Sequence, residues 1–230
     1  MASMPFRDRV DAGRRLAGAL TSYKAQRPVV LALPRGGVPV AAEIAAALDA
    51  PLDLLLVRKI GVPTQPELAM GAVVDGLSPI VVRNEEIIAL CGIEQSEFQA
   101  ACNEELAEVA RRRKLYFGGR SPVDLADRVV IVVDDGIATG ATTRAALRAV
   151  RGRKPKQLVL AVAVGAKETL EELRAEADAI VCLEEHEDLG AIGWYYADFR
   201  QITDAEVIAI LGRFHREKPT RTDDAASSST

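Results

Sequence analysis

The sequence has few aromatic residues, few cysteines and no long apolar run, and each shortage excludes a class of protein. Cys91, Cys102 and Cys182 lie far apart without a paired metal-ligand spacing, which favours a reduced, cytoplasmic setting over a disulfide framework. The first residues contain no apolar signal core and no apolar run approaches about 18 residues, so no membrane span is expected. No Gly-Lys-Ser/Thr triplet occurs, which excludes a Walker A phosphate loop, and no Ser/His/Asp arrangement is evident.

Composition favours one α/β domain with a core of small aliphatic side chains. The chain has 230 residues, of which 49% are hydrophobic and only 4% aromatic, and this suits helices packed on a parallel sheet. The net charge of -4 and the isoelectric point of about 5.4 do not favour nucleic acid as the main partner. We expect one domain over residues 1–216, followed by a polar, serine-rich tail over 217–230 that is disordered.

One stretch, residues 129–143, combines a buried strand, two acids and a hydroxyl-rich loop. The β-branched residues 129–133 form an apolar run without alternation, which is typical of a parallel strand buried on both faces. The run ends at Asp134 and Asp135, and a loop with two glycines and three threonines leads into a helix. Amides and hydroxyls at a helix N-terminus suit a phosphate, and paired carboxylates suit sugar hydroxyls or a metal. The alternative is an ordinary turn with an acidic cap.

This stretch resembles the phosphoribosyl pyrophosphate (PRPP) signature of type I phosphoribosyltransferases. The resemblance implies that Asp134 and Asp135 hold the ribose 2- and 3-hydroxyls, carry Mg²⁺ through those hydroxyls or water, and stabilise a ribosyl cation. It also implies a 5-phosphate loop, formed by Ala138, Thr139, Gly140, Ala141, Thr142 and Thr143. The sequence departs from the family at Gly136, where an aliphatic residue is usual. It resembles the adenine and uracil enzymes at Ala138, where the 6-oxopurine enzymes carry an Asp.

A second glycine-rich turn, Pro34-Arg35-Gly36-Gly37, follows a short strand predicted over 29–33 and opens a helix. Glycines let backbone amides approach a ligand closely, and Arg35 adds a forked, charge-assisted contact to an anion. The turn resembles the pyrophosphate loop of purine phosphoribosyltransferases. That resemblance implies pyrophosphate binding by Arg35, Gly36 and Gly37, and in that family often a cis peptide. Taken alone, the turn fits a plain strand-to-helix connection equally well.

A further strand, predicted over 52–57, ends in Arg58 and Lys59, and residues 62–70 are predicted to form a loop because they include two prolines. The adenine enzymes also carry Arg-Lys at this point, followed by a mobile loop that closes over PRPP. The resemblance therefore implies that Arg58 and Lys59 face pyrophosphate. A solvated basic pair is the alternative.

The middle of the chain predicts two short strands near 71–75 and 79–82, forming a hairpin, and then a helical insertion over about 84–117. Within the insertion, Asn84 caps a short helix, and residues 94–116 form a long charged helix with acids early and bases late, as the helix dipole favours. A phosphate-facing arm and a subunit contact are the alternatives for this helix. A separate helix is predicted over residues 6–23.

Strands and helices alternate through residue 183, which predicts an α/β fold with a central parallel sheet flanked by helices and its active site beyond the strand carboxyl ends. Residues 184–216 are expected to form a small hood. There Trp194 and Tyr195 are candidates for stacking on a base, with packing of the last helix as the alternative. Residues 184–188, which are four acids and His186, predict a solvated loop rather than a metal site. Thr203 and Glu206 predict a capping box for a helix ending near 214.

The expected function is a phosphoribosyltransferase that binds PRPP with Mg²⁺, transfers the 5-phosphoribosyl group to a purine or pyrimidine base and releases pyrophosphate. We expect a cytoplasmic homo-oligomer, a dimer, with neither membrane nor nucleic acid as a partner. A non-catalytic sensor of PRPP or of a nucleotide on the same fold is the first alternative. A phosphosugar-binding enzyme such as a phosphatase is the second, although no nucleophile or base is visible for it. The sequence does not specify the acceptor base.

Overall fold

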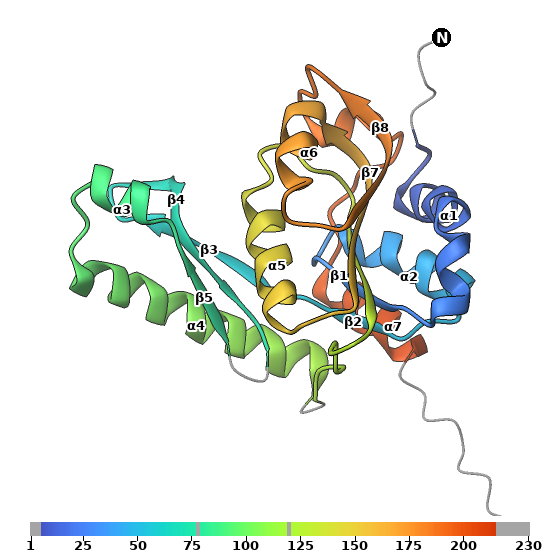
Figure 1. Cartoon of the computed structure of the whole chain (residues 1–230), viewed down its shortest axis with the longest axis horizontal. Coiled ribbons are helices and arrows are strands. Elements are labelled where there is room, and N and C mark those ends of the chain that lie inside the picture. The colour runs from blue at the N-terminus through green and yellow to red at the C-terminus, as the bar shows by residue number, and fades with distance from the viewer. Residues whose placement is uncertain (1–5, 77–78, 119–120, 215–230) are drawn as a thin grey trace, which may run out of the picture.

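The computed structural model describes residues 6–76, 79–118 and 121–214. The larger sheet has five parallel strands in the order β2-β1-β6-β7-β8, and the smaller sheet has three antiparallel strands in the order β3-β4-β5. The parallel strands are β1 (Val29–Ala32), β2 (Leu52–Leu54), β6 (Val129–Asp134), β7 (Gln157–Ala166) and β8 (Ala179–His186). Figure 1 shows the smaller sheet projecting from the larger one, so residues 57–117 are called the arm and the rest the body.

Strand β6 is the centre of the parallel sheet and is buried on both faces, as its unalternating apolar run predicts. Val129, Ile131 and Val133 belong to one apolar core, which includes side chains of the first two helices. Val130 and Val132 belong to a second core on the opposite face. The strand ends at Asp134, and Asp135 follows it directly.

Helices cover both faces of the parallel sheet, which confirms the predicted α/β class (Figure 1). Helices α1 (Arg9–Ala19), α2 (Gly37–Leu48) and α7 (Asp204–Phe214) lie on one face, and α5 (Ala141–Gly152) and α6 (Lys167–Leu173) lie on the other. The first helix is shorter than the expected 6–23, because Asp8 caps it and a 3-10 turn, Thr21–Gln26, follows it. In the described ranges, no helix combines the length and the apolar composition that crossing a membrane requires.

The prediction of a loop over 62–70 is wrong, since most of these residues belong to an antiparallel hairpin in the arm. Strand β3 (Val57–Val62) pairs with β4 (Gln65–Val74), and β4 pairs with β5 (Ile80–Arg83). The register shifts around Gly61, where a bulge accommodates Pro66 without a regular ladder. The hairpin expected near 71–82 is confirmed as the pair β4 and β5; residues 77 and 78 of its turn lie outside the described ranges.

The two helices predicted over about 84–117 are confirmed as α3 (Glu85–Leu90) and α4 (Gln95–Phe117). The Asn84 side chain accepts a hydrogen bond from the backbone N–H of Ile87, as expected for a helix cap. One stripe of α4 packs against the arm sheet and the body, with Phe98, Cys102, Val109, Tyr116 and Phe117 buried. The remaining face is charged, and this division explains how so polar a helix is held in place.

The segment after β8 returns to the first residues of the described chain. The backbone N–H of Phe6 donates to the carbonyl of Tyr195 at 2.7 Å, and the N–H of Ala197 donates to the carbonyl of Phe6 at 2.8 Å. The predicted capping box is confirmed, because Thr203 and Glu206 each accept from the other's backbone N–H. The tail expected to be disordered, 217–230, lies outside the described residues.

Candidate active site

The Pro34–Gly37 turn and the acid pair meet at the carboxyl edge of the parallel sheet. Strands β1 and β6 are neighbours, and the backbone N–H of Leu33 donates to the carbonyl of Val133 at 2.9 Å. A Cβ added at Gly36 would lie 2.1 Å from Oδ2 of Asp135, and one at Gly37 would lie 2.6 Å from the Val133 carbonyl oxygen. The turn therefore requires both glycines in order to lie against the acids. The peptide bond between Pro34 and Arg35 is cis.

Asp134 and Asp135 have different surroundings although they are adjacent. The backbone N–H of Asp135 donates to Oδ1 of Asp134 at 2.9 Å. Burial, and then the neighbouring charge of Asp135, raise the pKa of the Asp134 carboxyl well above its usual value. A carboxylate whose charged form is disfavoured in this way is stabilised by an approaching cation or hydroxyl donor, which is the property that a ribose or metal site needs.

Asp135 is held by Arg9, a residue that the sequence analysis did not identify. Nε of Arg9 lies 2.7 Å from Oδ2 of Asp135, and the two side chains are only 9% and 11% exposed. The hydroxyl of Tyr196 donates to the backbone carbonyl of Asp135 at 2.6 Å. A signal was available, because Arg9 lies on the same helical stripe as the buried Ala12 and Leu16, and a buried arginine needs a partner.

The predicted 5-phosphate loop begins α5 and leaves its first turn open. Gly140 has φ of +69° and precedes the helix without a side-chain cap, while Thr139 and Thr142 are exposed. The hydroxyl of Thr169 donates to the carbonyl of Ala138 at 2.7 Å, which fixes the loop to α6. Open amides at a helix N-terminus, on a loop fixed from behind, are suited to an anion.

The departure from the family pattern at Gly136 has a steric explanation. A Cβ at this position would lie 2.4 Å from Cγ2 of Ile192, a residue of the 3-10 turn Ile192–Tyr195. The hood therefore supplies the aliphatic group that the loop itself lacks. Neither the spacing nor the composition of the sequence identifies this contact.

Arg35 lies at the same edge but is engaged by the body's last helix. Its Nη1 lies 3.6 Å from Oδ1 of Asp204, and the hydroxyl of Tyr116 donates to the same oxygen at 2.6 Å. Burial, and then this hydrogen bond, raise the pKa of Tyr116 to about 12. An exposed ion pair of this length is weak, so Arg35 is available to an anionic ligand.

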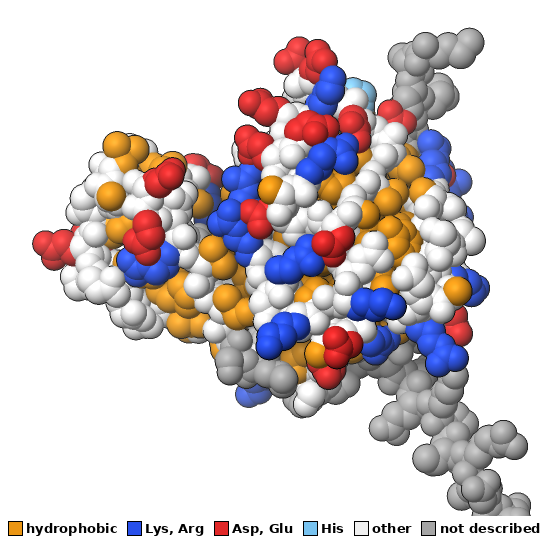
Figure 2. Space-filling model, in the orientation of Figure 1, with side chains coloured by type: hydrophobic (Ala, Val, Ile, Leu, Met, Phe, Trp, Pro, Cys, Tyr) orange, Lys and Arg blue, Asp and Glu red, His pale blue; other side chains and the backbone are white. Residues whose placement is uncertain are grey.

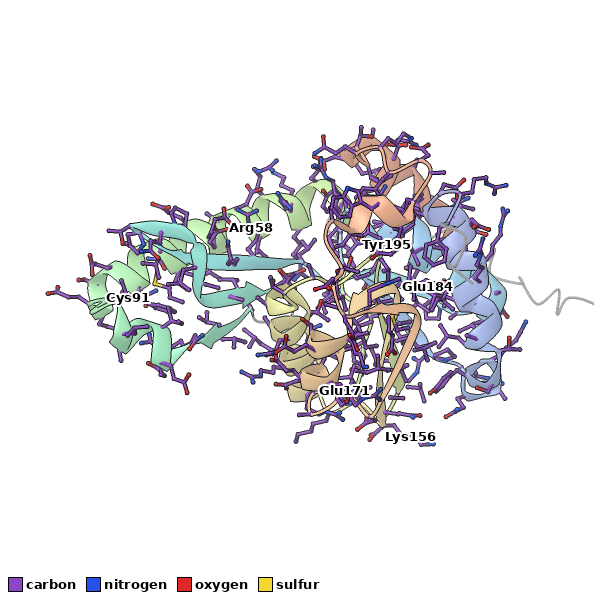
Figure 3. All side chains as sticks on the ribbon, turned by 90° about the horizontal axis from the view of Figure 1, so that it is seen from above. Arg58, Cys91, Lys156, Glu171, Glu184 and Tyr195 are labelled. Carbon is purple, nitrogen blue, oxygen red and sulfur yellow. The ribbon has the colours of Figure 1, made fainter. Side chains whose placement is uncertain are left out.

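Arg58 and Lys59 were expected at the end of a strand of the parallel sheet, and this prediction is wrong. Strand β2 ends at Leu54, and both residues belong to β3 of the arm, where Figure 3 shows Arg58. Nε of Arg58 lies 2.7 Å from Glu105 of α4, while Nζ of Lys59 lies 3.0 Å from Glu67. Lys59 also lines a small cavity together with Ala141 and Thr142 of the phosphate loop. The structure therefore brings Lys59, and not Arg58, to that loop.

The two aromatic candidates lie in the hood and face different surroundings. Trp194 is 76% exposed and packs against Gly190, where a Cβ would lie 2.2 Å from the indole ring. The ring of Tyr195 lies 4.4 Å from that of His186, and its hydroxyl donates to the carbonyl of Leu189 at 3.1 Å. Figure 3 shows Tyr195 on the body, well apart from Arg58 on the arm. Tyr196, which was not predicted, is the hood aromatic that reaches the acids.

A groove of about 460 Å³ lies where the arm meets the body, between β4, β5 and α5. Arg144 and Arg148 line it from α5, and Arg83 lines it from the arm. Figure 2 shows basic side chains gathered in this region of the surface, with acidic ones close by. The groove begins at Ala141, so it adjoins the phosphate loop and not the acid pair.

The acid pair fits Mg²⁺ that a substrate brings with it. In the described part of the chain, no three His, Cys, Asp or Glu residues converge as a metal cage. Magnesium is usually held through one or two carboxylates together with substrate phosphates and water. Asp134, a partly exposed carboxylate beside Asp135, supplies a donor of that kind.

Comparisons with known proteins identify the family. Residues 7–198 match the family model described as phosphoribosyl transferase domain, so the chain belongs to the type I phosphoribosyltransferase family. It is 43% identical over 212 residues to the "Putative phosphoribosyl transferase MT0597" and to the equally similar Rv0571c, both of Mycobacterium tuberculosis. That match covers 92% of this chain and 47% of each relative, so the chain spans about half their length.

A solved structure shares the fold over almost the whole chain. The crystal structure of TT1426 from Thermus thermophilus superimposes with a TM-score of 0.80 at 41% identity. The match covers 92% of this chain and 99% of that one. Together with the family match and the five-stranded parallel sheet, this confirms the expected type I phosphoribosyltransferase fold.

Proposed function

We propose that this chain is a phosphoribosyltransferase that binds PRPP with Mg²⁺, transfers the 5-phosphoribosyl group to a nitrogenous base and releases pyrophosphate. The observation that carries the proposal is the contact between the glycine turn and the acid pair, because Gly36 lies directly against the Asp135 carboxylate. The family supports transfer from PRPP in general, and the geometry supports the assignment of individual groups.

The carboxyl edge of the sheet offers one matching group for each part of PRPP. The open first turn of α5 suits the 5-phosphate, and Asp134 suits the ribose hydroxyls. The turn with Arg35 suits pyrophosphate, and Lys59 approaches the phosphate loop from the arm. Magnesium bound to the substrate would neutralise charge on the departing pyrophosphate.

The chemical step needs charge stabilisation rather than a protein nucleophile. The bond from C1 of ribose to the pyrophosphate oxygen breaks with its electron pair on pyrophosphate, and a nitrogen lone pair of the base forms the new bond to C1. The nitrogen then releases its proton. Positive charge develops on the ribose, and the carboxylates of Asp134 and Asp135 stabilise it from a fixed position.

Ala138 directs the choice of base. Its methyl group neither donates nor accepts a proton, and its backbone carbonyl is occupied by Thr169. We therefore expect poor transfer to hypoxanthine and guanine, whose reaction benefits from an acid at this position. Efficient transfer to either base would show that another group supplies the proton.

The test is calorimetric titration of Mg²⁺-PRPP into the full chain, followed by assay of pyrophosphate release with a panel of purine and pyrimidine bases. Binding with turnover of at least one base is the expected result. Binding without turnover would support the PRPP sensor instead. Absence of binding would overturn both functions.

A further inference from the structure

Arg9 is a buried charged residue in a helix that otherwise packs apolar side chains against the sheet. Its guanidinium contacts three parts of the molecule at once. Nε donates to Asp135, Nη1 donates to the carbonyl of Arg200 at 2.8 Å, and Cζ lies 3.9 Å from the ring centre of Phe199. One side chain thus joins the first helix, the hood and the acid pair.

The oxygen that Arg9 holds is the one closest to the glycine turn. Oδ2 of Asp135 accepts the hydrogen bond from Arg9. The same oxygen is the atom nearest to a Cβ added at Gly36, which would lie 2.1 Å from it. If this carboxylate rotated, it would move against the backbone of the Pro34–Gly37 turn. The position of the turn and the rotamer of Asp135 are therefore set together.

The two acids differ in what is left for a ligand. Asp135 is paired with Arg9, whereas Asp134 forms no ion pair in the described part of the chain. With Arg9 in place, only one carboxylate of the pair lacks a cation, so the edge does not present two free negative charges to pyrophosphate.

We propose that Arg9 is a positioning residue for the proposed transfer from PRPP: it locks Asp135 against the glycine turn, and so leaves Asp134 as the acid that receives the substrate. The inference rests on the proposed function. Arg9 acts through Asp135 and does not touch the substrate.

Lysine cannot replace arginine in this role. Its single ammonium group could reach Asp135 but could not also donate to the Arg200 carbonyl and stack on Phe199. Arg9→Lys is therefore the conservative variant, with the charge retained and the geometry lost. Arg9→Met combined with Asp135→Asn removes both buried charges together, so neither is left without a partner and the chain is expected to fold.

The experiment is a double-mutant cycle on the full chain, with Arg9→Met, Asp135→Asn and the combined variant, beside Arg9→Lys. Arg15→Met is the matched control, because Arg15 is on the same helix, pairs with Asp11 and lies over the ring of Phe6, yet has no contact with the acids. Calorimetry measures the affinity for Mg²⁺-PRPP, and melting curves report folding. Where a base is accepted, KM for PRPP and KM for the base are measured separately.

We expect Arg9→Lys to fold and to weaken Mg²⁺-PRPP about tenfold, as one lost charge-assisted contact does. The combined variant should bind Mg²⁺-PRPP with an affinity within about twofold of that of Asp135→Asn alone, because both substitutions remove the same Arg9–Asp135 contact. KM for PRPP should rise while KM for the base does not. If the losses multiply, or if Arg9→Lys binds as the wild type does, Arg9 is structural and the inference is wrong. Failure of the wild type to bind PRPP would overturn the proposed function first.

Discussion

The body and the arm carry their charged side chains in different places. In the body, Arg9 and Asp135 form an ion pair that is almost fully buried at the carboxyl edge of the sheet. In the arm, ion pairs such as Arg58 with Glu105 and Lys59 with Glu67 lie at the surface. Breaking a buried pair leaves a charge without water or partner, whereas breaking a surface pair exposes it to solvent. Substitutions at the Arg9–Asp135 pair should therefore have large effects, and substitutions at these two arm pairs should have small ones.

The largest effect is expected from the acid pair. Asp134→Asn and Asp135→Asn should each weaken Mg²⁺-PRPP roughly ten- to a hundredfold. The first removes the charge that receives the substrate, and the second releases the contact with Arg9 that positions the glycine turn. Transfer should fall further than binding, since positive charge develops only in the transition state. Calorimetry and pyrophosphate release are the measurements.

The two acid variants should differ in stability. Asp135→Asn leaves Arg9 buried without its counter-charge and should lower the free energy of unfolding by about 3–5 kcal/mol, while Asp134→Asn relieves repulsion and should not. Asp49→Asn is the control, because Asp49 caps the far end of α2 in a left-handed conformation that Asn tolerates. Equal binding by wild type and both acid variants would mean that the carboxylates are structural.

Gly36→Ala tests the close contact between the two loops. The new methyl would lie 2.1 Å from Asp135, and the strain should lower the free energy of unfolding by about 1–3 kcal/mol and weaken PRPP binding. Gly18→Ala is the matched control, since no atom lies within 4 Å of a Cβ added there. Chemical denaturation and calorimetry compare the two. Equal stability of both variants would show that the turn can move away from the acid.

Arg35→Ala should weaken pyrophosphate and PRPP roughly tenfold, since Arg35 supplies one charge-assisted contact from a half-exposed position. The affinity for a nucleoside monophosphate, which has no pyrophosphate, should fall less. Arg14→Ala, which breaks an exposed pair with Glu43, is the control and should change neither affinity. Equal losses for both ligands would contradict the placement of Arg35 on pyrophosphate.

Lys59 and Arg58 are adjacent in sequence, and within the arm their substitutions should differ in their effect on PRPP affinity. Lys59→Ala should weaken PRPP by about three- to tenfold, because Lys59 lies beside the phosphate loop. Arg58→Ala should weaken it less, because Arg58 is engaged by Glu105 on the side of α4. Competition binding against labelled PRPP ranks the two. The reverse order would restore the role that the family resemblance implies for Arg58.

The smallest effect is expected at Glu108 on α4, which pairs with Arg111 and Arg112 at the surface. These hydrogen bonds lower the pKa of Glu108 to about 2 from its ordinary 4.5. A depressed pKa means stability that is present above the unfolded value and lost as pH falls toward 2. Because the group is solvated, Glu108→Gln should change the free energy of unfolding by less than about 1 kcal/mol. Chemical denaturation at about pH 5 and about pH 3 measures this change. A larger loss of stability that does not depend on salt would show that these ion pairs are not solvated.

Patterns local in sequence predicted much of the fold. The unalternating run before Asp134 predicted a central parallel strand, and the strand lies at the centre of the sheet. Pro34–Gly37 and the loop after Asp135 were placed at one edge because both follow parallel strands, and they meet there. These predictions succeeded because burial on two faces and glycine-dependent turns leave a mark within a few residues.

The failures came from contacts between distant segments. Residues 62–70 contain two prolines and polar side chains, which favour a loop, but pairing with β3 and packing of the arm form a strand with a bulge. Lys59 reaches the phosphate loop only because the arm sheet lies against α5. Such contacts depend on how elements pack after they form.

The sequence by itself determined the class of the fold, the edge of the sheet where the two motifs meet and the family of the protein, because these follow from periodicity and from motifs a dozen residues long. Only the tertiary structure decided how the two acids differ. Arg9 and Asp135 are 126 positions apart, and no local pattern links them. The two residues pair because both charges are buried, and a buried charge is costly unless the fold places an opposite charge beside it.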